Sequence, residues 1–152
     1  MRSRTNYERQ LAQLLYKRGW VVIRAPASGA KVKRYPYPDL VALKKGYAAA
    51  IEVKTSSEER TIYLPPKQVE TLMVWKIRGG AEPWIAVKVL DGRGWRFFRA
   101  EDLERAQRSF KLVPQGGLTL DEFDRLSEAA RTVPLTNFVT GDEERRLLSL
   151  DG

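Results

Sequence analysis

The chain has 152 residues and a net charge of +8 at neutral pH, and it contains no cysteine and no histidine. This length suits one domain, and the composition excludes disulfides, thiolate nucleophiles, Cys/His zinc sites and imidazole acid–base catalysis. Any metal ion must therefore be held by oxygen ligands, which favours magnesium or manganese. No apolar run reaches membrane-spanning length and the N-terminus lacks an apolar signal region, so we expect a cytoplasmic protein without a membrane partner.

The positive charge is concentrated in the first two thirds of the chain. Residues 1–100 contain 20 Lys and Arg against 8 Asp and Glu, whereas residues 101–152 contain 7 against 11. A basic body of this kind favours a polyanionic partner, and nucleic acid is favoured over membrane because the sequence has no basic amphipathic anchor. Solubility alone is the alternative explanation for the charge.

The first half of the chain predicts one helix followed by three strands. Residues 5–18 form an amphipathic helical pattern, with Thr5 as the N-cap and Gly19 as the stop signal. The three strands are predicted at residues 20–25, 39–43 and 47–54, with a loop rich in Pro, Gly and Lys before the second.

The second half predicts further helices and one hairpin. A helix over 65–80 has Pro near its start and Gly past its end, and strands at 83–90 and 95–100 pair across a DGRG turn. A short helix over 101–107 and a longer one over 118–131 follow, the latter opened by a capping box. We expect an α/β domain with a mixed sheet over residues 1–139, and an acidic tail over 140–152 whose composition allows disorder.

One pair of strands carries charged residues in an otherwise apolar setting. The second and third predicted strands can form a hairpin with a two-residue turn at Lys45 and Gly46. In that register Asp39 lies directly opposite Glu52, and Lys54 lies on the same face. Two carboxylates at the end of a buried sheet need a cation or a shared proton. A divalent metal ion satisfies this need, and a structural ion pair between Lys54 and one of the acids is the alternative.

The segment PDLVALKKGYAAAIEVK resembles the core of the PD-(D/E)xK nucleases, with Pro38 and Asp39 as one element and residues 52–54 as ExK. Together with YERQLAQLLYKRGWVVIRAPASGA before it and QVETLMVWKIRGG and GLTLDEFDRL after it, the chain is similar to the archaeal Holliday junction resolvase family from about residue 5 to about residue 139. The resemblance implies a restriction-endonuclease-like core, a central mixed sheet of about five strands flanked by helices. It also implies a metal-dependent endonuclease that resolves four-way junctions by paired nicking in recombination and repair.

Carried over by position, the resemblance implies metal-binding acids at Glu8, Asp39 and Glu52 and a catalytic lysine at Lys54. It implies Mg²⁺ as the cofactor, for which Mn²⁺ would substitute, and it puts Ser28 near the scissile phosphate. The basic residues expected to grip the DNA backbone are Arg9, Arg24, Lys31, Lys33 and Arg34, and the expected accessory residue beside the active site is Gln68.

Several of these residues have a structural alternative. Glu8 follows Thr5 at the spacing of a capping box, which needs no metal ion. Ser28 can shape a turn, Arg24 can be a surface charge and Gln68 an ordinary residue of a first helical turn. The aromatic residues Trp20, Trp75 and Trp84 are predicted to belong to the core or to a dimer contact, with the core favoured.

The resemblance further implies a homodimer, which suits the two-fold symmetry of a four-way junction. The apolar segments TLMVW and WRFFRA are the candidate interface. Leu135, Phe138 and Val139 have a spacing loosely like that of a sliding-clamp-binding peptide. Two competing hypotheses remain: a non-catalytic protein that binds branched DNA, and an endonuclease of the same fold that acts on other DNA.

Overall fold

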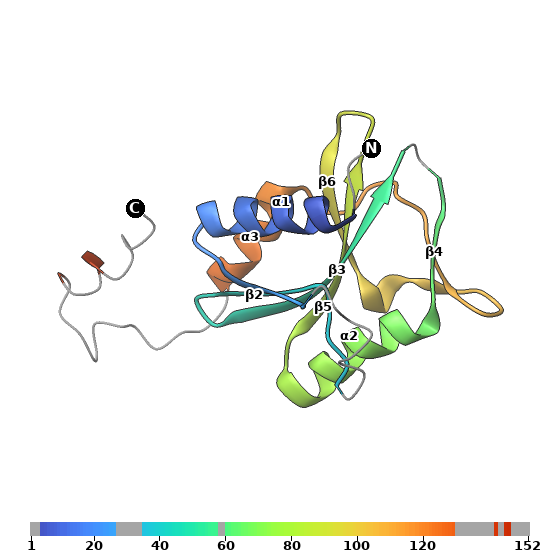
Figure 1. The fold of residues 1–152 in the computed structure, drawn as a ribbon, viewed down its shortest axis with the longest axis horizontal. Helices are drawn as coiled ribbons and strands as arrows, with labels where there is room; N and C mark the ends of the chain where they lie inside the picture. Colours follow the sequence, from blue (N-terminus) through green and yellow to red (C-terminus); the bar gives the residue numbers. More distant parts are fainter. Residues whose placement is uncertain (1–3, 27–34, 58–59, 130–141, 143–144, 147–152) are drawn as a thin grey trace.

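Five strands form one central sheet in the computed structural model, which describes residues 4–26, 35–57, 60–129, 142 and 145–146 (Figure 1). The strand order is β1-β2-β3-β5-β6, and only the β3–β5 pair is parallel, so the predicted mixed sheet is confirmed. The bounds are Val21–Arg24 for β1, Leu40–Lys44 for β2, Tyr47–Ser56 for β3, Glu82–Val89 for β5 and Gly94–Arg99 for β6.

Helices cover both faces of this sheet. Helix α1 (Arg4–Lys17) lies with α3 on one face, and α2 (Pro66–Gly79) lies on the other (Figure 1). The core on the α1 face includes Leu11 and Leu15, whereas Val69 and Leu72 of α2 belong to the core of the opposite face. None of the helices in the described part of the chain has the length and hydropathy of a membrane-spanning segment.

The two long helices begin and end close to where the sequence predicts. Helix α2 has a proline at its first position, and Gly80 ends it in a left-handed conformation with a φ of 72°. Helix α1 begins at Arg4, so the prediction of Thr5 as its N-cap is wrong, because an N-cap residue precedes the first helical residue.

The predicted hairpin register is confirmed between β2 and β3. Leu40 pairs with Ile51 and, at the other end, Lys44 pairs with Tyr47. The turn residues Lys45 and Gly46 have φ values of 47° and 85°, as a tight type I′ hairpin turn requires. Tight turn chemistry and an apolar pattern on both faces therefore fix the register locally.

A small second sheet was not predicted from the sequence. Its strands are β4 (Ile62–Leu64), β8 (Phe110–Leu112) and β7 (Glu104–Arg105), in that order. The predicted helix over 101–107 is wrong: a single 3₁₀ turn, Ala100–Asp102, leads directly into β7. The segment has few apolar residues to pack as a helix, and pairing with β8 satisfies its backbone instead.

The C-terminal helix α3 (Leu120–Arg125) opens with the predicted capping box of Thr119 and Glu122. A 3₁₀ turn, Leu126–Ala129, continues it, so the regular α-helix is shorter than predicted. Phe123 of α3 is fully buried, with its ring stacked on those of Phe97 and Trp20 at centroid distances of 4.2 and 5.2 Å. The core prediction is confirmed for Trp20 and Trp84; Trp75 is only partly buried, and its indole donates to the carbonyl of Pro36.

Asp124 connects α3 to Trp20, just before β1, and to Lys44 of β2. Its Oδ1 accepts hydrogen bonds from the indole Nε1 of Trp20 at 2.8 Å and from Nζ of Lys44 at 2.9 Å. Burial raises the pKa of Asp124, but these two hydrogen bonds and the charges of Lys44 and Arg18 together hold it below its ordinary value. The carboxylate thus stays charged where it joins α3 to β2.

Candidate active site

The main sheet opens where β2 ends and β3 continues. Strand β3 has ten residues and β2 has five, and their pairing ends at Leu40 and Ile51. Residues 52–56 of β3 therefore extend beyond β2 and keep a strand neighbour only on the β5 side. In this extension Glu52, Val53 and Ser56 are buried, and Lys54 is half-buried.

Asp39 stands at this open end, one residue before β2. Its Oδ2 accepts a hydrogen bond from the backbone N–H of Val53 at 2.8 Å, and its own carbonyl accepts one from Ala25 at 3.0 Å. The carboxylate therefore continues the strand pairing of β3 where the β2 backbone has ended. Both hydrogen bonds hold Asp39 rigidly between β1 and β3.

Glu52 and Lys54 follow on β3 with side chains on the face that α2 covers, because Ile51 and Val53 between them point to the α1 face. Glu52 is 5% exposed, and Lys54 is half-buried. Leu40 pairs with Ile51, so the same register places the preceding residue, Asp39, opposite Glu52. The structure thus brings Asp39 and Glu52 together with Lys54 on the same face, whereas their chemical roles stay predictions.

Glu8 is the third predicted acid. It is on α1, which covers the opposite face of the sheet, and its Oε2 is 3.9 Å from NH2 of Arg24. In residues 4–26, 35–57 and 60–129, no three acidic side chains gather into a group that could hold a metal ion. The role of Glu8 as a third metal ligand stays a prediction, and Arg24 is the basic partner of Glu8 rather than an isolated surface charge.

Gln68 lies in the first turn of α2, on the same side of the sheet as Glu52. Its backbone N–H donates to the carbonyl of Pro65 at 3.0 Å. Its side-chain Oε1 is buried and, among the described residues, has no hydrogen-bond partner. A buried amide oxygen without a partner costs about 1–3 kcal/mol, so it marks a place where a bound group could donate.

The remaining predicted residues divide into two sets. Arg9 and Arg24 line one groove between α1 and β1. Outside the described residues lie Ser28, predicted near the scissile phosphate, the predicted DNA-contacting residues Lys31, Lys33 and Arg34, and the clamp-like residues Leu135, Phe138 and Val139. The same groove includes Gln13, Tyr16 and Lys17, which sequence reasoning missed because residues on a helix surface carry no motif.

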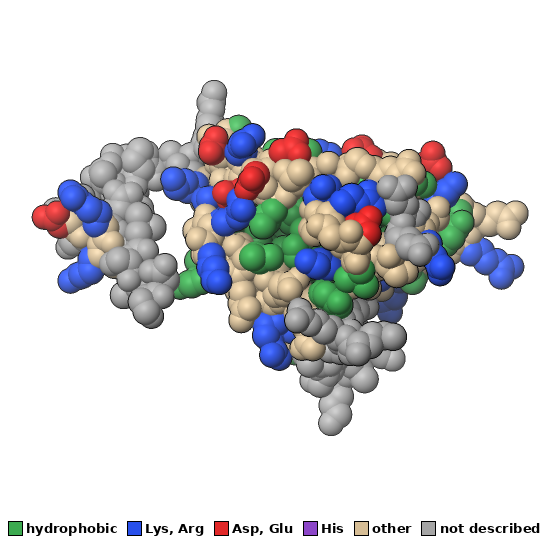
Figure 2. Space-filling view, turned by 90° about the horizontal axis from the view of Figure 1, so that it is seen from above, with side chains coloured by type: hydrophobic (Ala, Val, Ile, Leu, Met, Phe, Trp, Pro, Cys, Tyr) green, Lys and Arg blue, Asp and Glu red, His purple; other side chains and the backbone are tan. Residues whose placement is uncertain are grey.

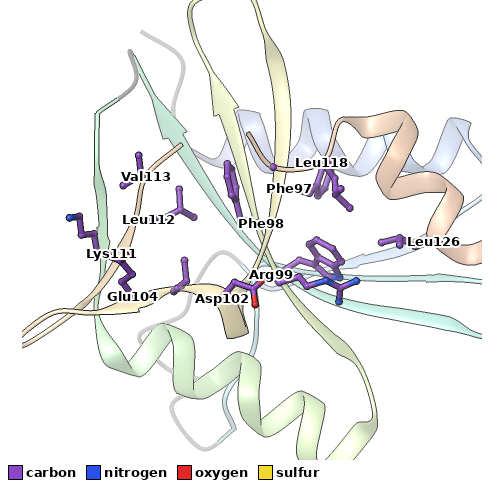
Figure 3. A pocket seen from close by; sticks show the side chains of 13 residues that line it. Phe97, Phe98, Arg99, Asp102, Glu104, Lys111, Leu112, Val113, Leu118 and Leu126 are labelled. Carbon is purple, nitrogen blue, oxygen red and sulfur yellow. The ribbon is translucent and has the colours of Figure 1, made fainter. Parts of the chain in front are cut away.

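A cavity of about 610 Å³ lies between β6, the small sheet and the segment before α3 (Figure 3). Its walls carry apolar side chains such as Phe98, Leu112 and Leu118, with Arg99 and Asp102 at one side. Of the predicted site residues that the structure describes, none lines it. It is therefore separate from the open end of the sheet.

Comparisons with known proteins agree on one family. The sequence profile described as archaeal Holliday junction resolvase (Hjc) matches residues 1–132. The chain is 40% identical over 108 residues to crossover junction endodeoxyribonuclease Hjc of Archaeoglobus fulgidus, which covers 71% of this chain and 76% of that protein. It is 29% identical over 136 residues to the protein of the same name from Sulfolobus acidocaldarius, which covers 87% and 93%.

A solved structure gives the same result for the fold. The structure described as Archaeoglobus fulgidus Hjc, a Holliday junction resolvase from an archaeal hyperthermophile, matches with a TM-score of 0.69 and 35% identity. The match covers 81% of this chain and 98% of that one. The predicted restriction-endonuclease-like fold is therefore confirmed.

Proposed function

The chain belongs to the archaeal Holliday junction resolvase family and is a crossover junction endodeoxyribonuclease, and we propose that it cuts four-way junctions at the open end of its sheet. The observation that carries this assignment of the site is the position of Asp39 beside Glu52, with Lys54 on the same face. Two acids and an ammonium group on one face suit a phosphodiester, which needs charge neutralisation as it is cleaved.

The donor set suits magnesium. Asp39 and Glu52 offer hard carboxylate oxygens, and Mg²⁺ is usually held by one or two carboxylates while it keeps several waters and binds phosphate oxygens. Asp39 and Glu52 supply two such ligands, and Glu8 is the third ligand that the resemblance implies. When bound, the ion would polarise the scissile phosphate and make a coordinated water more acidic. Mn²⁺ prefers the same ligands and should substitute.

The protein's own groups have separate tasks at this site. The hydrogen bond from Val53 fixes the Asp39 carboxylate, and burial limits the movement of Glu52. The Lys54 ammonium, on the same face, stabilises the negative charge that builds up on the phosphate in the transition state. The buried Oε1 of Gln68 is suited to accept a hydrogen bond from the attacking water.

The test of this function is cleavage of a synthetic four-way junction and of linear duplex, with Mg²⁺ or with a chelator. We expect paired nicks on opposed strands of the junction only, and none with the chelator. Equal cleavage of linear duplex would favour an endonuclease of the same fold that acts on other DNA. Tight junction binding without any nick in either metal would favour a non-catalytic branched-DNA-binding protein.

A homodimer is the assembly that paired nicking requires, because a four-way junction has two-fold symmetry. Exposed apolar side chains on the α2 face of the molecule support it, namely Val21 and Ile23 of β1, Leu43 of β2 and Ile77 of α2. Val21 pairs with Leu43, and Ile23 follows two residues later on the same face. The WRFFRA strand does not supply this surface, because Trp95 and Phe97 are buried in the core.

We expect the double variant Ile23→Glu, Ile77→Glu to be a monomer that nicks one strand without the paired second nick. Both side chains are largely exposed, at 67% and 79%, so the charges should oppose association without disturbing the fold. Sedimentation at micromolar concentration and a junction assay that resolves single from paired nicks would measure this. Tyr63→Glu, on the small sheet, is the control that should stay dimeric. Sedimentation of the wild type as a monomer would contradict the homodimer. A double variant that stays dimeric would mean that the interface lies on another surface.

The predicted residues of the loop before β2 and of the C-terminal tail lie outside the described residues, and their roles are proposals. Ser28 near the scissile phosphate and the lysines and arginine of the same loop remain predictions. Binding of a sliding clamp through Leu135, Phe138 and Val139 is a prediction of the same kind.

A further inference from the structure

The segment that leads into Asp39 lies against the end of α2. Residues 35–37 line a groove of about 410 Å³ together with side chains of α2, among them Val74, Trp75 and Arg78. The indole Nε1 of Trp75 donates a hydrogen bond of 2.8 Å to the carbonyl oxygen of Pro36. This contact joins α2 to a point that lies shortly before Asp39 in the chain.

Two prolines make the segment of residues 35–38 stiff. The rings of Pro36 and Pro38 fix φ at about −65°, and the tyrosine before each proline is restricted to extended conformations. The Asp39 Cα lies at most about 10 Å further along the chain than that of Pro36. Because the connection is short and stiff, fixing the carbonyl of Pro36 also limits where Asp39 can lie.

Trp75 is itself held in place. Val69 and Leu72 anchor α2 in the core of its face, and the carbonyl of Trp75 accepts a hydrogen bond from the N–H of Ala81 at 3.2 Å. Strand β5 begins directly after Ala81 and pairs with β3. Trp75 therefore has a fixed position relative to the strand that carries Glu52.

The Asp39 carboxylate needs such an anchor to keep its own contact. Its Oδ2 accepts the N–H of Val53 at 2.8 Å, beyond the last pair of the β2–β3 ladder. A displacement of about 1 Å takes a hydrogen bond of this length out of the favourable range. The position of the segment before β2 therefore decides whether this hydrogen bond forms.

We propose that Trp75 is a positioning residue for Asp39. Its hydrogen bond to Pro36 anchors the segment of residues 35–38 and thereby holds the Asp39 carboxylate against β3, where it lies opposite Glu52. The inference rests on the proposed function for what the carboxylate does there, namely to bind a metal ion.

A purely structural role is the alternative for Trp75, because its ring also packs against the core of the α2 face. That role predicts a lower stability of the whole fold, whereas positioning predicts a local change at Asp39. Two backbone amides report on Asp39 directly. The N–H of Val53 bonds to its carboxylate, and the N–H of Ala25 bonds to its carbonyl oxygen.

The test is amide hydrogen exchange of the full chain, followed by NMR without metal or DNA. Trp75→Phe keeps an aromatic ring but removes the N–H donor. We expect the amides of Val53 and Ala25 to exchange about twofold to tenfold faster in this variant, the range that the loss of one typical hydrogen bond allows. The amides of Ala42 and Ala49, in the middle of the β2–β3 pairing, should be unchanged.

Trp20→Phe is the matched control. It makes the same substitution and removes an indole hydrogen bond of the same length, 2.8 Å, from Trp20 to Asp124. Trp20 precedes β1, whereas Asp39 lies next to the other end of that strand, where Arg24 pairs with Leu40. Equal acceleration of Val53 exchange in both variants, or none in Trp75→Phe, would overturn the inference.

Pro36→Gly loosens the same segment without a change in α2. It keeps the carbonyl acceptor but removes the ring that restricts φ, so it should accelerate the exchange of the same two amides. Unchanged exchange in Pro36→Gly would contradict the stiff connection, even if Trp75→Phe did not fold.

The magnesium dependence of cleavage is the second readout. Trp75→Phe should need about twofold to tenfold more Mg²⁺ for half-maximal junction cleavage, because its Asp39 carboxylate is held less firmly. Junction binding in chelator should be unchanged. Trp75 is uncharged and lies on α2, on the other side of the sheet from the Lys and Arg side chains that are prominent on the face of α1 and α3 (Figure 2). Sedimentation verifies that the variant keeps the wild-type assembly.

The two readouts separate this inference from the proposed function. Faster exchange of Val53 with an unchanged magnesium dependence would contradict Asp39 as a metal ligand and leave its positioning by Trp75 intact. Failure of the wild type to cut junctions would overturn the proposed function, whereas the exchange of Val53 would still measure how Asp39 is held.

Discussion

Replacing Glu52 with glutamine is expected to reduce junction cleavage by about a thousandfold or more while junction binding stays within a fewfold of the wild type. The substitution keeps the shape of a side chain that is 5% exposed, but it removes the negative charge beside Asp39. A metal ion held by two carboxylates contributes several kcal/mol of transition-state stabilisation, and each 1.36 kcal/mol is a factor of about ten in rate. Single-turnover cleavage in Mg²⁺ and binding in chelator measure the two effects separately.

Two further variants sharpen this experiment. Asp39→Asn should reduce cleavage in the same way, because it removes the other carboxylate of the pair. Glu128→Gln, which neutralises an exposed acid after α3, should cleave at the wild-type rate. If Glu52→Gln cleaved normally, Glu52 would be structural and the ion-pair interpretation of Lys54 would be correct. Thermal unfolding of each variant verifies that the fold is intact.

The placement of Asp39 opposite Glu52 was predictable because it depends on local information. The turn residues Lys45 and Gly46 fix the hairpin, and the side-chain period of two then determines which residues share a face. A shift of one residue would have moved Glu52 to the α1 face and away from Asp39. Register was therefore enough to bring the two acids together without knowledge of the rest of the fold.

Glu8 shows where such information ends. Its spacing from Thr5 fits a capping box and its place in the motif fits a metal ligand, yet it lies within 3.9 Å of Arg24. Which face of the sheet α1 covers is decided by the packing of Leu11 and Leu15, not by the residues around Glu8. The contact with Arg24 could not be predicted without the tertiary arrangement, and the role of Glu8 as a metal ligand stays a prediction.

The small sheet illustrates the same limit for secondary structure. Residues 101–107 have a composition that suits a helix, but Glu104 and Arg105 pair with Lys111 and Phe110 of β8, which in turn pairs with β4. Strand β4 is distant in sequence from β8, so the pairing overrides local propensity. The groove residues Gln13 and Lys17 were missed for a related reason, since only their position opposite β1 distinguishes them from other exposed helical residues.

Replacing Phe123 with alanine is expected to lower the free energy of unfolding by about 3–5 kcal/mol, the usual cost of removing a buried aromatic ring. The ring is fully buried and stacks on Phe97 and Trp20, and Trp84 meets it edge-on at 5.3 Å. Its removal leaves a cavity among three other aromatic rings, which cannot collapse without disturbing the sheet. Denaturant unfolding monitored by tryptophan fluorescence gives the value directly.

The same variant distinguishes stability from catalysis. Arg125→Ala, on the exposed side of α3, should change the unfolding free energy by only about 0.5 kcal/mol and serves as the control. Phe123 belongs to the core on the α1 face, whereas Glu52 and Lys54 lie on the α2 face. Phe123→Ala should therefore cut junctions at the wild-type rate per folded molecule at temperatures below its unfolding transition. A cost below about 1 kcal/mol would mean that α3 is held mainly by Asp124, with its hydrogen bonds to Trp20 and Lys44, and not by the aromatic cluster.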